Sequence, residues 1–111
     1  MKNLQVAYLL DFYGRLLPDK QREILEMYYE EDMSLAEIAE SMGITRQGVH
    51  DSIRRGEKEI VSMEEKLCLM DRFLQISKSL DTVEELIAPA SANCDVYEQV
   101  IAELGKIRNI I

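Results

Sequence analysis

A short basic stretch lies within an otherwise acidic chain, and its residue types are those that contact nucleic acids. Between residues 45 and 58 four basic side chains face two acidic ones, so the local net charge is +2. The whole chain of 111 residues carries 13 basic and 21 acidic residues, a net charge of −8. Proteins that bind polyanions without selectivity carry an excess of lysine and arginine. The composition argues against such a general binder, and any nucleic-acid contact is expected within residues 45–58.

Two residues at the start of this stretch suit direct contacts with base edges. Arginine hydrogen-bonds to O6 and N7 of guanine, and glutamine to N6 and N7 of adenine. We therefore expect Arg46 and Gln47 to contact bases, with His50 beside them on a base or a phosphate. Basic residues further along are expected to hold phosphates. The predicted nucleic-acid-binding residues are Arg46, Gln47, His50, Arg54, Arg55 and Lys58.

Each of these side chains has a plain structural alternative, namely a solvated helix face. Asp51 weakens the nucleic-acid interpretation, because a carboxylate repels phosphates unless it accepts a hydrogen bond from N4 of cytosine. Gly48 costs about 1 kcal/mol in a helix relative to alanine. Its presence indicates either a close approach of the backbone to DNA or tight packing against a neighbouring helix, and the sequence favours neither.

Local signals define the elements that position these residues. Residues 34–37, Ser-Leu-Ala-Glu, form a capping box that starts a short helix. Gly43 supplies the left-handed turn that ends it, and Thr45 caps the next helix at once. Val49 and Ile53 stand where they would hold the second helix against the first. This spacing predicts a helix-turn-helix.

The helix that begins at Thr45 is expected to be very long. Beyond residue 58, apolar residues recur at spacings of three and four, the pattern of a helix that buries one stripe. These positions are Ile60, Met63, Leu67, Met70 and Leu74. We interpret them as a coiled-coil-like seam between two subunits, although the core of a single subunit explains them equally well. Asp81 and Glu84 resemble a second capping box and predict a new helix start there.

The predicted fold is all-α, a helix-turn-helix with a long helix and a helical C-terminal tail. The length fits one ordinary domain, residues 1–111. Within it we expect an N-terminal helix in residues 1–17 and the helix-turn-helix core in residues 18–58. Residues 59–111 are expected to form a tail for dimerisation or interaction.

Several function classes find no support in the sequence. It has no glycine-rich phosphate loop, no nucleophile–base pair and no cluster of metal ligands, so we expect no enzyme, catalytic residue, metal or cofactor. The two cysteines are most simply reduced and structural. No apolar run approaches the roughly 18 residues of a membrane span. The start of the chain shows no cleavage signal, so a cytoplasmic protein is expected.

Three motifs follow one another in residues 16–58: a Leu17-Pro18 opening, a Ser-Leu-x-Glu-Ile-Ala helix from residue 34, and Gly-Ile-Thr-Arg from residue 43. This order resembles the promoter-contacting fourth region of sigma-70-type factors. The resemblance implies a three-helix core of the winged-helix-superfamily type. The match departs from the pattern at Asp51, where that family is usually more basic. The whole chain, with its short first helix and helical tail, more closely resembles the small YlxM-type helix-turn-helix proteins of Gram-positive bacteria.

Genes of YlxM-type proteins typically neighbour those of the signal recognition particle. The resemblance therefore implies a regulatory or accessory role in that targeting pathway. Combined with the motif, it leads us to expect a homodimeric regulator that binds DNA through residues 45–58. The alternative is an acidic adaptor that binds a protein or RNA component of the signal recognition particle. The net charge of −4 in residues 81–111 favours this alternative.

Overall fold

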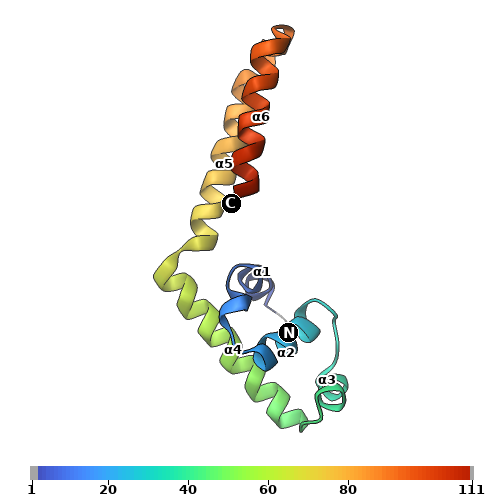
Figure 1. The fold of residues 1–111 in the computed structure, drawn as a ribbon. Coiled ribbons are helices and arrows are strands. Elements are labelled where there is room, and N and C mark those ends of the chain that lie inside the picture. Colours follow the sequence, from blue (N-terminus) through green and yellow to red (C-terminus); the bar gives the residue numbers. More distant parts are fainter. Residues whose placement is uncertain (1–2, 111) are drawn as a thin grey trace. The chain divides into compact units, whose positions relative to one another are not determined.

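The structure, a computed structural model, describes residues 3–110, and all regular elements of this range are helices (Figure 1). Within it there are six α-helices and two short 3₁₀ helices. Their bounds are α1 Leu4–Tyr13, η1 Gly14–Leu16, α2 Asp19–Tyr29, α3 Leu35–Met42, α4 Arg46–Leu67, α5 Leu69–Ile87, η2 Ala88–Ala92 and α6 Cys94–Ile110. The prediction of an all-α fold is confirmed for these residues.

The chain divides into two compact units, which we call unit 1, up to Met70, and unit 2, from Asp71. The sequence places the start of the tail earlier, at residue 59. Unit 1 extends further because Ile60 is fully buried in its core, and Met63 packs partly against the same core. The second half of α4 therefore belongs with the helix-turn-helix.

Helix α4 is the central element of unit 1, and α1, α2 and α3 all pack against it. Apolar side chains from all four helices and the turn before α2 meet in one core. Its buried members are Val6, Leu9, Leu10, Tyr13, Leu17, Ile24, Leu25, Ile38, Val49, Ile53 and Ile60. Because α4 packs against three other helices, its orientation within unit 1 is fixed, and so is the face that it exposes.

The turn between α3 and α4 has the predicted caps. The Ser34 hydroxyl accepts a hydrogen bond from the Glu37 N–H at 3.1 Å, and the Glu37 carboxylate accepts one from the Ser34 N–H at 3.1 Å. These bonds hold the pKa of Glu37 below its usual value. Gly43 ends α3 with a left-handed backbone, φ 66°, and Thr45 is the N-cap of α4. The predicted helix-turn-helix is confirmed.

Helix α4 ends because Cys68 adopts a left-handed backbone, with φ 56°. The buried Tyr13 stabilises this corner: its hydroxyl donates to Oε1 of Glu64 at 2.5 Å and accepts from the N–H of Leu69 at 3.0 Å. The same carboxylate oxygen accepts from the N–H of Met70 at 3.0 Å. Two amides that the start of α5 would otherwise leave unpaired are satisfied in this way. Burial, with the adjacent carboxylate, raises the pKa of Tyr13, so its phenol keeps the proton that it donates.

The expectation of one helix running through residue 74 is therefore wrong, and the predicted seam is not one continuous stripe. Ile60 is fully buried inside unit 1, so it is not available to a second subunit. Met63 and Met70 pack partly against the same core. Leu67 and Leu74 are 46% and 54% exposed and lie on different helices. Interpretation of the pattern as the core of a single subunit holds for Ile60.

In unit 2, α5 and α6 lie side by side (Figure 1). Leu80 and Leu104 are the buried apolar residues of this pair. Nη2 of Arg108 on α6 donates to Oδ1 of Asp81 at 2.8 Å and to Oε1 of Glu84 at 3.1 Å, both on α5. The helix start predicted at Asp81 is wrong, because α5 continues through this position and the two carboxylates bind the opposite helix instead.

Candidate nucleic-acid interface

The first turn of α4 exposes the two side chains that were predicted to contact bases. Thr45 caps the helix by accepting the N–H of Gly48 at 3.0 Å. Arg46 and Gln47, which follow the cap, are both exposed. The N-terminus of a helix carries partial positive charge, which favours nearby anions such as phosphate. This end of α4 is electrostatically suited to a nucleic acid.

The opposite face of α4 is anchored in the core. Val49 is fully buried and Ile53 is 5% exposed. The fully buried Ile38 of α3 belongs to the same core, so α3 packs against the buried face of α4. This is the arrangement that a helix-turn-helix needs to present its second helix to a groove of DNA.

Among the described residues, no other helix packs against Gly48. A Cβ at this position would meet the Oγ1 of Thr45 at 3.1 Å and the Cδ1 of Ile44 at 3.9 Å, and it would meet no atom of another helix within 4 Å among the described residues. Both atoms belong to the turn before α4. Packing against another helix therefore does not account for the glycine. Its close approach to a partner stays a prediction.

His50 lies at the edge of the same face, with 45% of its side chain exposed. It lines a shallow hollow together with Arg46, Gln47 and Leu35, the first residue of α3. Its Nδ1 is 3.7 Å from Oδ1 of Asp51 and makes no hydrogen bond to any described residue. The structure thus brings the first three predicted site residues together around one hollow.

Asp51 lies beside these residues, and its side chain is 58% exposed. Its Oδ1 accepts a hydrogen bond from Nε2 of Gln47 at 3.0 Å, one helical turn earlier. Among the described residues, no arginine or lysine forms an ion pair with it. The site therefore contains an exposed carboxylate that pairs with no arginine or lysine of residues 3–110.

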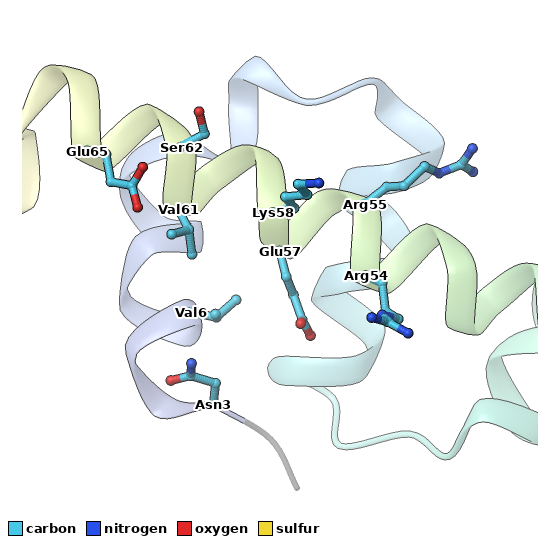
Figure 2. Close-up of a pocket in the computed structure, with 9 residues that line it drawn as sticks. All are labelled: Asn3, Val6, Arg54, Arg55, Glu57, Lys58, Val61, Ser62 and Glu65. Carbon is cyan, nitrogen blue, oxygen red and sulfur yellow. The ribbon is translucent and has the colours of Figure 1, made fainter.

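The remaining predicted residues, Arg54, Arg55 and Lys58, line an open groove of about 630 Å³ beside the first turn of α1. Figure 2 shows that the two arginines leave α4 in different directions. Glu57 also lines the groove, but it is tied to α2, since its Oε1 accepts a hydrogen bond from the Tyr29 hydroxyl at 2.6 Å. Burial, together with Glu57, raises the pKa of Tyr29, so the phenol stays protonated. The three cations extend the site along α4.

One basic residue near this row was missed in the sequence. Lys66 lines a second hollow together with Arg55, Lys58 and Met63. It lies eight residues after Lys58, close to two turns of the helix, so the spacing could have revealed it. Basic side chains therefore occur as far as the last turn of α4, and the acidic Glu59 lines the same hollow.

No group of three or more histidine, cysteine, aspartate or glutamate side chains in residues 3–110 is arranged to hold a metal ion. In the same range, no helix combines the length and apolar character needed to cross a membrane.

Sequence comparisons connect this chain with a family of helix-turn-helix proteins. The model of the UPF0122 family, described as "Putative helix-turn-helix protein, YlxM / p13 like", matches residues 1–102. A UPF0122 protein of Desulforamulus reducens is 47% identical over 83 residues, which are 75% of this chain and 71% of that protein. One from Acetivibrio thermocellus is 54% identical over 74 residues, 67% of this chain and 63% of that protein.

A more distant relative aligns over nearly the whole chain. A UPF0122 protein of Bacillus cereus is 36% identical over 106 residues, which are 96% of both proteins. The aligned region therefore includes both units. With the helix-turn-helix in place and the family match spanning it, the chain belongs to the UPF0122 family.

Proposed function

We propose that this protein is a regulator that binds double-stranded DNA by placing the outer face of the first half of α4 in the major groove. The observation that carries the proposal is the exposure of Arg46 and Gln47 in the first turn of a helix whose other face rests on α3. In helix-turn-helix proteins these positions contact base edges. Arg54, Arg55 and Lys58 would hold the phosphates beside the groove.

The charge distribution sets the expected strength of this binding. The net charge is +2 over residues 45–58 but −8 over the whole chain. Attraction to DNA is therefore local and weak for one subunit, and salt should screen it readily. Useful affinity then depends on contacts to particular bases or on a second subunit.

Binding of the full chain to random-sequence duplexes tests the proposal. Retention is expected at low salt, with log K falling linearly with log salt concentration and a slope of about −3 for three phosphate contacts. The duplexes that the wild-type chain retains define its preferred sequence. Arg46→Ala is expected to weaken binding to that sequence roughly tenfold while hardly changing the affinity for random duplexes. If no duplex is retained at about 50 mM salt, the DNA-binding function is rejected.

We extend the proposal to a homodimer formed through unit 2. The apolar residues that unit 2 buries are Leu80 and Leu104, whereas many others are exposed. The large exposed apolar residues there are Leu74, Ile76, Val83, Leu86, Val96, Ile107 and Ile110. Two helices of this length bury too little apolar surface to be stable alone. A second copy related by a two-fold axis would complete a four-helix bundle.

Sedimentation measures the mass of the assembly directly. The full chain is expected at twice its mass of 12.8 kDa. Leu86→Asp, at a side chain that is 75% exposed, is expected to give the single-chain mass, because a carboxylate cannot be buried in an apolar interface without a partner. Leu4→Asp is the matched control in unit 1, at 77% exposure, and should leave the dimer intact. A wild-type chain that sediments as a monomer removes this extension.

A second candidate function rests on the acidic surface of unit 2. Glu85, Asp95, Glu98 and Glu103 are all exposed on α5 and α6. Such a surface favours a basic partner, which would make the protein an adaptor for a component of the signal recognition particle. Tight binding to a component of that particle, with no retention of DNA, would favour this candidate. The resemblance to YlxM-type proteins is what links this candidate to the targeting pathway. Under the first proposal, a DNA partner would imply a cytoplasmic location.

A further inference from the structure

We infer that Asp51 makes the DNA contact selective by requiring a base amino group, the N4 group of cytosine, opposite the first two turns of α4. This inference rests on the proposed DNA-binding function and adds to it a residue that determines specificity. Its physical basis is an exposed negative charge that needs a hydrogen-bond donor from a base edge, and cytosine offers that donor without an adjacent acceptor.

The hydrogen bond between Gln47 and Asp51 fixes the orientation of both side chains. The bond joins Nε2 of Gln47 to Oδ1 of Asp51 at 3.0 Å. An ionised carboxylate only accepts hydrogen bonds, so the amide nitrogen must face Asp51. The amide oxygen Oε1 of Gln47 and the second carboxylate oxygen of Asp51 are the acceptors left over. Between Arg46 and Arg54 the outer face of α4 thus presents these acceptors and the second N–H of the Gln47 amide.

No arginine or lysine of residues 3–110 neutralises the carboxylate of Asp51. Its side chain is 58% exposed, and Oδ1 lies 3.7 Å from Nδ1 of His50. In the described residues, arginine and lysine make their ion pairs elsewhere. When α4 enters a groove, this charge loses water and needs a donor from the DNA, because an unpaired desolvated charge is costly.

The four bases differ in what they offer to such a carboxylate. In the major groove guanine presents O6 and N7 and thymine presents O4, all of which are acceptors that repel it. Cytosine presents only the N4 amino group, a pure donor, and adenine presents its N6 amino group beside the acceptor N7. Cytosine is therefore the base that suits Asp51 best, and guanine is the worst. Selectivity of this kind comes from repulsion of the wrong partner as much as from attraction of the right one.

The test is a selection of binding sequences by the wild-type chain and by Asp51→Asn, followed by competition binding. Asparagine has nearly the same shape but no charge, and it can turn its amide nitrogen towards an acceptor. Wild type is expected to prefer cytosine over guanine at one position by roughly tenfold, the effect of one good base contact. For Asp51→Asn that preference should fall to within about twofold while the affinity for random duplexes rises. Tighter binding with poorer discrimination is a result that a merely structural role would not produce.

Glu85→Gln is the matched control, since it removes an exposed acidic charge from a different helix, α5. It should leave the selected sequence unchanged. If Asp51→Asn selects the same bases as the wild type at every position, the inference is overturned and DNA binding itself stands. If the wild type retains no duplex, the proposed function fails first, and the two failures are distinguished by that measurement.

Discussion

Shortening Leu25 to alanine is expected to lower the free energy of unfolding by about 2–5 kcal/mol, the usual cost of truncating a fully buried leucine. Leu25 lies on α2, is fully buried, and packs against Gly56 of α4. The loss would be a large fraction of the total stability of a small protein. Its size follows from the lost transfer of apolar surface and from the cavity that remains.

Gly56 on α4 makes this prediction sharper. A Cβ at Gly56 would lie 2.6 Å from Cδ1 and 3.3 Å from Cγ of Leu25, closer than side chains normally pack. Gly56→Ala alone is therefore expected to lose about 1–3 kcal/mol through overpacking, partly offset by about 1 kcal/mol of helix propensity. When Leu25 is already alanine, both clashing atoms are gone. Gly56→Ala should then stabilise the protein by about 1 kcal/mol.

Urea unfolding of the wild type, the two single variants and the double variant measures this coupling. Gly105→Ala on α6 is the control, because a Cβ there would lie in open space among the described residues, with no neighbouring side chain within 4 Å. It should add the same small stabilisation whether residue 25 is leucine or alanine. A double variant less stable than Leu25→Ala would show that α2 and α4 do not pack as described.

The helix-turn-helix could be predicted because its signals are local. The capping box at Ser34 and Glu37, the left-handed turn at Gly43 and the cap at Thr45 each depend on residues within about four positions, the reach of a helix cap. The hydrogen bonds that these residues make are those the spacing implies. Local chemistry and tertiary packing agree here, so the sequence was sufficient.

The end of α4 at Cys68 could not be predicted in this way. A left-handed backbone is unfavourable for cysteine, and the apolar pattern continues through the break. What stabilises the corner is Tyr13, whose hydroxyl contacts Glu64 and the N–H of Leu69 from a distant part of the chain. Apolar periodicity reports which residues are buried, but not which helix or subunit buries them.

The candidate site shows the same division. Its basic residues and Asp51 were identified from the sequence. The hydrogen bond between Gln47 and Asp51 was not predicted, although it follows the i,i+4 spacing of a helix. By contrast, Glu57 entered the sequence analysis only as a negative charge that lowers the net charge of residues 45–58. Its bond to Tyr29, which ties it to α2, links segments that only the fold brings together.

Reversing two charges on α4 is expected to remove DNA binding almost completely. In the variant Arg54→Glu with Lys58→Glu, two exposed cations of the groove become anions. Losing one phosphate contact costs roughly tenfold in affinity, so the loss of both is expected to reach at least about a hundredfold. The salt slope should become about two units shallower, because two fewer counterions are released. Both side chains are exposed, so the melting temperature should change little.

The control must separate a local effect from the change in total charge. Arg72→Glu with Lys78→Glu makes the same change of four charge units on α5, where both side chains are exposed. A global electrostatic effect acts through the whole field and would weaken binding in both variants alike. A phosphate contact acts only at the interface, so the control is expected to bind within about threefold of the wild type with an unchanged salt slope. Equal losses in the two variants would mean that α4 is not the surface that meets DNA.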